Sequence, residues 1–173
     1  MITLYDDDKR PTMRFNFPAP AFSAESIDID DNKYDGSPIV DIVAENEYAL
    51  LFVEAKNFIH ISTDPSIQAS MDISQARSLA DMRDIEGYAR KMLRKLEHSL
   101  FVWVASGKHI DKPVFMILAF NTPSEFLSRE RIRLTDRLRK YIPAGAKNNS
   151  GVVFDMPSLD CIEQRYGFSA TVI

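Results

Sequence analysis

Three ionisable residues interrupt two otherwise apolar segments of the chain. Asp41 lies in the segment 38–44, and both Glu54 and Lys56 lie in the segment 48–58. Both segments are rich in apolar and β-branched residues, and the short link between them predicts a β-hairpin. Because Glu54 and Lys56 are two residues apart, we expect them to share one face of their strand. An even-numbered loop places Asp41 on that face too.

The three groups together predict a site for a hard divalent cation. A loop at 46–47 places Asp41 opposite Phe52 and diagonal to Glu54, about 7–8 Å apart at the backbone, so their carboxylates can share an ion. Charges among apolar side chains are costly unless they are paired or metal-bound. Mg²⁺ takes one or two carboxylates and accepts phosphate oxygens. The spacing therefore suits metal-assisted phosphodiester hydrolysis, with Lys56 orienting the attacking water. The alternative is a buried Glu54–Lys56 salt bridge, with Asp41 capping a strand end.

These residues resemble the signature of the PD-(D/E)XK nuclease superfamily, which has the restriction-endonuclease-like fold. The match is a Pro-x-x-Asp ending at Asp41, then twelve residues, then Glu54-x-Lys56, and it covers about residues 25–121. In that family the Asp lies on the second core strand, the (D/E)xK closes the third, and a helix and another strand follow. The resemblance implies that Asp41 and Glu54 bind Mg²⁺ (or Mn²⁺), that the Ala55 carbonyl is a further ligand, and that Lys56 is the catalytic lysine.

An upstream acidic residue completes the site in many members of that family. Such members carry a Glu on an N-terminal helix, and Glu25 is the nearest candidate here. Asp28 and Asp30 are alternatives, although a strand with a solvent-facing side explains both equally well.

Two sets of basic residues bear on the substrate. Residues 128–147 hold seven bases and two acids, although the net charge of the chain is −4. Four bases in this stretch recur at helical spacing: Arg129, Arg133, Arg137 and Lys140. Another set lies opposite the apolar stripe of the preceding predicted helix: Arg90, Lys91, Arg94 and Lys95. Either set could follow a phosphate backbone, and a solvated helix face explains each set taken alone.

The elements that position these residues predict an α/β domain. Strands are expected at 26–30, 38–44, 48–58, 112–121 and 152–154, and helices at 72–106, 122–141 and 157–165. The order predicts an antiparallel hairpin that leads into a mixed sheet with helices on both faces, a restriction-endonuclease-like arrangement. The strand 48–58 is apolar on both faces and should be central. We expect residues 1–24 to be an irregular arm, broken by three prolines, and residues 25–173 to be a single domain.

Several other functions are disfavoured. The residues that could bind zinc lack the spacing of metal ligands: His60, His98, His109 and Cys161. The chain has no P-loop and no GxGxxG. The single cysteine, the acidic start of the chain and the lack of an apolar run of about 20 residues predict a cytoplasmic protein without a membrane partner.

The leading hypothesis is a Mg²⁺-dependent nuclease, with DNA rather than RNA as its expected substrate. Sequence-specific cleavage is expected to require a homodimer or a partner subunit. The alternative is a non-catalytic interaction protein on the same scaffold, such as an adaptor or an immunity-type subunit. A nuclease needs Asp41 and Glu54 to converge in an open cleft. An adaptor is expected to have Lys56 closed onto Glu54 within a covered sheet.

Overall fold

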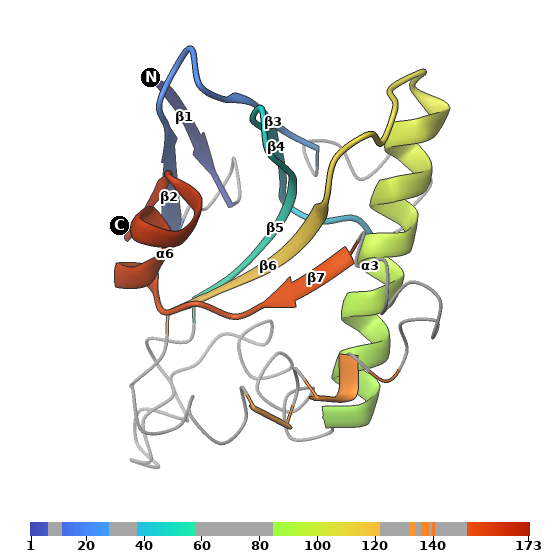
Figure 1. Cartoon of the computed structure of the whole chain (residues 1–173). Coiled ribbons are helices and arrows are strands. Elements are labelled where there is room, and N and C mark those ends of the chain that lie inside the picture. The colour runs from blue at the N-terminus through green and yellow to red at the C-terminus, as the bar shows by residue number, and fades with distance from the viewer. Residues whose placement is uncertain are drawn as a thin grey trace, which may run out of the picture.

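The structure is a computed structural model that describes residues 1–6, 12–27, 38–57, 85–121, 132–133, 136–138, 140 and 152–173. For residues 56–57, 85 and 120–121 it describes the backbone alone. Helix α3 (Ile85–Ala105) covers one face of a larger β-sheet, and a smaller sheet with helix α6 (Leu159–Tyr166) covers the other face (Figure 1). The fold class is therefore α/β, as the sequence predicts.

Within the described residues, the larger sheet is mixed and has five strands. In spatial order they are β3 (Ser23–Ser26), β4 (Ile42–Glu45), β5 (Leu50–Asn57), β6 (Val114–Asn121) and β7 (Val152–Asp155). β3, β4 and β5 pair antiparallel, whereas β5, β6 and β7 pair parallel. The predicted central strand is confirmed, because β5 is third of five and its side chains contribute to the core on both faces.

Helix α3 lies between the parallel strands β5 and β6 in the chain, where a crossover helix is expected. Its apolar stripe is buried against the sheet at Tyr88, Met92, Leu96 and Trp103. The predicted break at Gly107 is confirmed, because this glycine has φ 77° and its N–H bonds to the carbonyl of Val104. The first half of the predicted helix 72–106 lies outside the described residues.

The smaller sheet corrects one expectation. Residues 1–24 are not an irregular arm, since they include strands β1 (Ile2–Tyr5) and β2 (Met13–Phe17), which form an antiparallel sheet with β8 (Ser169–Val172). The apolar residues of β2 alternate with polar ones, and Met13, Phe15 and Phe17 are fully buried. The prolines flank β2 and do not interrupt it, so the ladder loses no donor.

The remaining predicted elements have mixed outcomes. The strands expected at 112–121 and 152–154 and the helix at 157–165 correspond to β6, β7 and α6. Most of the strand expected at 26–30 lies outside the described residues, and β3 ends at Ser26. Most of the helix expected at 122–141 lies outside them too, although its described residues are helical and Leu138 is buried in the core beneath α3. No helix within the described ranges is long and apolar enough to cross a membrane.

Candidate functional site

The β4–β5 hairpin brings Asp41 and Glu54 closer than the sequence predicts. The paired strands end at Glu45 and Leu50, so residues 46–49 form the turn. Within it, the Asn46 N–H bonds to the Ala49 carbonyl at 3.0 Å, and the Asn46 side chain accepts two further turn N–H groups. The register pairs Ile42 with Val53, and continuing it by one residue places Asp41 opposite Glu54. The prediction that Asp41 lies opposite Phe52 and diagonal to Glu54 is therefore wrong, because Asp41 lies directly opposite Glu54. The shared face remains, because the longer turn is still even-numbered.

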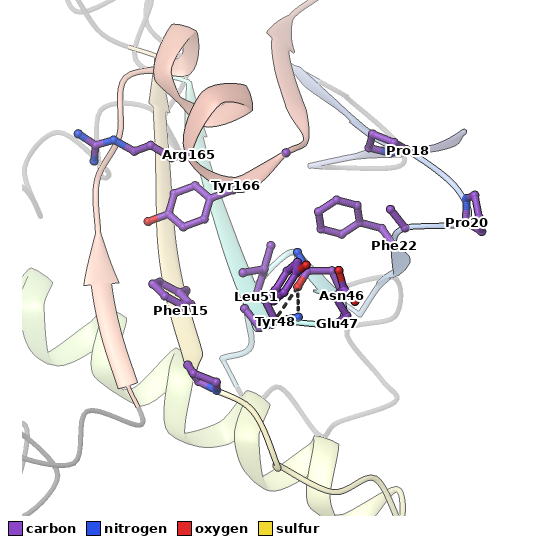
Figure 2. Close-up of a pocket in the computed structure, with 14 residues that line it drawn as sticks. Pro18, Pro20, Phe22, Asn46, Glu47, Tyr48, Leu51, Phe115, Arg165 and Tyr166 are labelled. Atoms are coloured by element: carbon purple, nitrogen blue, oxygen red, sulfur yellow. Dashed lines mark hydrogen bonds between the residues drawn. The ribbon is translucent and has the colours of Figure 1, made fainter.

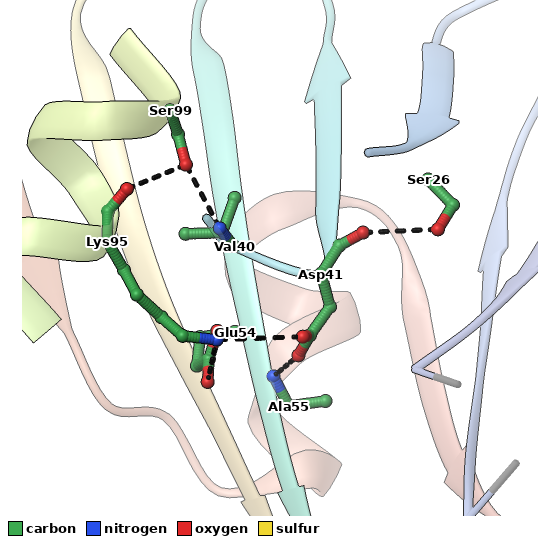
Figure 3. Close-up of polar contacts among 7 residues, drawn as sticks. All are labelled: Ser26, Val40, Asp41, Glu54, Ala55, Lys95 and Ser99. Carbon is green, nitrogen blue, oxygen red and sulfur yellow. Dashed lines mark hydrogen bonds and ion pairs between the residues drawn. The ribbon is translucent and has the colours of Figure 1, made fainter. Parts of the chain in front are cut away.

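Asp41 is tied into the sheet by its own side chain and backbone. Its Oδ2 accepts the N–H of Ala55 at 2.6 Å, and its carbonyl accepts the Ser26 hydroxyl (Figure 3). The same carbonyl also accepts the Ile27 N–H. The residue is 5% exposed. A carboxylate that accepts a backbone N–H at the start of a strand is held in one orientation, so Asp41 is directed toward the end of β5 that carries Glu54.

Glu54 is bonded to a lysine of the covering helix. Lys95 of α3 donates to Oε1 of Glu54 at 2.8 Å and to Oε2 at 2.7 Å, and its Nζ is 4.0 Å from Oδ1 of Asp41 (Figure 3). Glu54 is 0% exposed and Lys95 is 9% exposed. We name these three residues the Asp41–Glu54–Lys95 cluster. Its ammonium lies between two carboxylates that come from neighbouring strands.

Ser99 fixes the helix above this cluster. Its hydroxyl donates to the Lys95 carbonyl at 2.7 Å and accepts the N–H of Val40 at 3.0 Å (Figure 3). Both Ser99 and Val40 are buried, so this bond satisfies a backbone donor that has no access to water. The contact joins one turn of α3 to the residue before Asp41 and sets the distance between helix and strand.

The prediction that all four basic residues of this helix face solvent is wrong for Lys95. It was expected on the solvent side together with Arg90, Lys91 and Arg94, and those three are indeed exposed, whereas Lys95 faces the sheet. The sequence held a signal for this. At 3.6 residues per turn, the seven-residue step from Tyr88 brings Lys95 within about 20° of the buried stripe.

The other predicted site residues have different positions. The side chain of Lys56 lies outside the described residues, and its backbone pairs with Phe120 in the β5–β6 ladder. Ala55 lies in the site and donates its N–H to Asp41. Glu25 is not brought into the cluster, because its half-exposed carboxylate is bound by Lys108. Asp28 and Asp30 lie outside the described residues.

Of the predicted phosphate-binding residues, Arg137 is placed at the first turn of α3. Arg129 is outside the described residues, and Arg133, Arg137 and Lys140 are exposed. Nε of Arg137 is 3.4 Å from a carboxylate oxygen of Glu86, in the first turn of α3. Glu86 precedes Lys95 by nine residues, about 13 Å along the helix axis. Arg137 therefore lies about two and a half helical turns from Lys95 and is bound to a different carboxylate.

A cavity of about 1180 Å³ opens on the opposite face of the larger sheet. Its walls are mainly apolar and include Phe22, Tyr48, Phe115 and Tyr166 (Figure 2). Among its described lining residues, Glu47 is the one carboxylate, so the cavity does not offer paired acids. The Tyr166 hydroxyl donates to Asp155 at 2.6 Å, and burial together with this bond raises the pKa of Tyr166 above its usual range.

Asp41 and Glu54 are the two side chains of the cluster that could hold a metal ion. Within the described part of the chain, no group of three or more His, Cys, Asp and Glu side chains is placed to hold a metal ion. Mg²⁺ is usually held by only one or two carboxylates and retains several waters. Asp41 and Glu54 meet that requirement, and the ammonium of Lys95 already occupies a cation position beside both of them.

Comparisons of the chain with protein-family models, with curated proteins and with solved structures give no match.

Proposed function

We propose that the chain is a metal-dependent nuclease of the PD-(D/E)XK type that hydrolyses phosphodiester bonds in DNA. The observation that carries this proposal is the convergence of Asp41 and Glu54 on one ammonium, from neighbouring positions of an antiparallel hairpin. Two acids opposite each other in a mostly apolar core serve no packing purpose. Their placement is costly unless a cation joins them.

The order of the elements supports the restriction-endonuclease-like arrangement that this proposal requires. Asp41 directly precedes β4, the second strand of the larger sheet, and Glu54 is the fifth residue of the eight in β5, the third strand. Helix α3 and the parallel strand β6 follow. The same order of Asp strand, Glu-x-Lys strand, helix and strand is what the resemblance implies.

Each residue of the site has a proposed role. Asp41 and Glu54 would hold Mg²⁺, which, when bound, would polarise the phosphate and assist ionisation of the attacking water. The Ala55 N–H points at Asp41, and the N–H and C=O of one strand residue face the same edge, so the Ala55 carbonyl is directed toward that edge as a further ligand. Lys56 would orient the water and offset charge that develops on the phosphate.

Substrate binding would use the exposed bases of the predicted helix 122–141. Arg133, Arg137 and Lys140 can contact phosphates without reading the base sequence. Sequence-specific cleavage would use a homodimer or a partner subunit.

One observation favours a second candidate, a non-catalytic interaction protein on the same scaffold. Glu54 is fully buried, and both of its oxygens are bound by Lys95, so the resting site is covered by α3. In this case the cluster would hold the helix on the sheet, and the chain would act through its surface.

Cleavage of supercoiled plasmid DNA with Mg²⁺ or Mn²⁺ separates the two candidates. We expect the wild type to nick the plasmid only with metal, and Asp41→Asn and Lys56→Ala to lose activity by on the order of 100-fold or more. Glu45→Gln is the matched control, because this β4 carboxylate is bound to Lys112 at 2.7 Å, away from the cluster. A folded wild type that is inert with both metals would favour the interaction protein.

A further inference from the structure

We propose that Lys95 is a built-in counter-ion of Asp41 and Glu54, which a divalent cation must displace from Glu54 in order to bind. The inference rests on the proposed function, because it concerns how the same site takes up its metal. It adds a residue from α3 that controls metal affinity and that neither the Asp41/Glu54/Lys56 pattern nor the helical periodicity had assigned to the site.

The ammonium of Lys95 lies where a cation shared by the two acids would lie. Nζ contacts Oε1 and Oε2 of Glu54 at 2.8 and 2.7 Å and is 4.0 Å from Oδ1 of Asp41. Because Nζ contacts both oxygens, the ammonium lies between them, in the position that a cation bound to both oxygens of Glu54 would take. Because Glu54 is 0% exposed, a metal that approaches this carboxylate meets the ammonium and no bulk solvent.

A divalent cation cannot use this carboxylate while the ammonium stays in place. Mg²⁺ needs carboxylate oxygens at about 2.0–2.1 Å with near-octahedral geometry, and the position between the two oxygens of Glu54 is taken. Two positive ions on one buried carboxylate also repel each other strongly, since the surroundings screen them less than water does. Metal binding is therefore coupled to release of the Lys95 ammonium from Glu54.

The contact that holds α3 on the strand does not involve the side chain of Lys95. Ser99 bonds to the backbone carbonyl of Lys95 and to the N–H of Val40, so the helix is held to the strand independently of the lysine side chain. The four-carbon stem of lysine has several rotatable bonds. Rotation of the Lys95 side chain away from Glu54 therefore leaves the Ser99–Val40 contact intact.

Calorimetric titration with MgCl₂ and MnCl₂ tests this competition directly. Removing the competing charge in Lys95→Met should tighten metal binding by about tenfold, which corresponds to about 1.4 kcal/mol of binding free energy. Lys91→Met is the matched control, because Lys91 is exposed one turn earlier on the same helix, and it should bind metal as the wild type does. Circular dichroism establishes that each protein is folded.

The outcomes distinguish this inference from the proposed function. Equal or weaker binding by Lys95→Met overturns the competition, while metal binding by the wild type still supports the nuclease site. If neither folded protein binds metal, the metal site fails and the proposed function fails with it. If Lys95→Met does not fold, Lys95→Gln keeps a hydrogen-bond donor for Glu54 without the charge.

A crystal structure of the wild type with MnCl₂ gives an answer that depends on no variant. We expect an anomalous peak beside Asp41 and Glu54 with Lys95 Nζ moved out of hydrogen-bond distance from both oxygens of Glu54. A bound Mn²⁺ with Nζ still in place overturns the inference and leaves the metal site intact. No peak at this position counts against both.

Discussion

Lys95→Met should destabilise the protein far more than the loss of a lysine on a helix usually does. The substitution keeps an unbranched side chain but removes the charge that binds both oxygens of Glu54, a residue with 0% exposure. Breaking a buried ion pair by removing one partner costs about 3–5 kcal/mol, because the other charge stays buried. For a chain of this size, that corresponds to a fall in Tm of roughly 6–20 °C.

A double-mutant cycle assigns this loss to the pair. Urea unfolding followed by circular dichroism gives the free energy of unfolding for the wild type, Lys95→Met, Glu54→Leu and the double variant. Two apolar residues of similar volume pack without a buried charge, so the double variant should recover more than half of the loss. Recovery should stay incomplete, because Asp41, with Oδ1 4.0 Å from Nζ, still loses its neighbour.

Two results would refute this reasoning. A loss of less than about 1 kcal/mol in Lys95→Met would match an exposed ion pair and would mean that Glu54 is not held by Lys95. Additive effects in the cycle would mean that the two side chains do not interact. Lys91→Met, an exposed lysine on the same helix, reports any general effect of replacing lysine by methionine in α3.

Three further predictions address other contacts. Ser99→Ala leaves the buried Val40 N–H without its acceptor, so unfolding should become easier by about 1–3 kcal/mol and the amide hydrogen of Val40 should exchange faster by NMR. Asp41→Asn keeps an acceptor for the strand N–H but removes the charge, so calorimetry should show loss of Mg²⁺ binding with the fold retained. The pKa of Tyr166 is raised by burial and by its bond to Asp155, so the native state keeps this proton at a pH where the unfolded chain loses it. Stability from Tyr166 is therefore complete below about pH 10 and declines above it, and Tyr166→Phe should flatten that alkaline decline in urea unfolding curves.

The central hairpin was predictable because its signals are local. The apolar run that became β5 is longer than its neighbours and apolar on both faces, which only a covered central strand explains. The shared face of Asp41 and Glu54 follows from an even-numbered turn. The turn length did not follow, because the side chain of Asn46 caps the turn and extends it to four residues.

The smaller sheet is hard to predict from local patterns, because one of its three strands, β8, lies far in sequence from β1 and β2. β2 alternates apolar and polar residues, but its partner β8 lies at the other end of the chain. The prolines near the N-terminus indicate irregular structure when the sequence is read alone, but they lie before and after β2 and not within it. Pairing across such a separation depends on the core formed by Phe15, Phe17 and Phe168, which no local pattern reveals.

By itself, the sequence determined which acids can meet, because strand periodicity and the parity of the turn place Asp41 and Glu54 on one face. It also determined the α/β class, through the change of period between the strands and the helix. Only the tertiary structure decided which cation meets those acids. Lys95 is separated from Glu54 by 41 positions, and its side chain reaches the carboxylate only because the apolar stripe of α3 docks on the sheet and turns that face inward. Hydrophobic burial of the stripe therefore places the charge that the site requires.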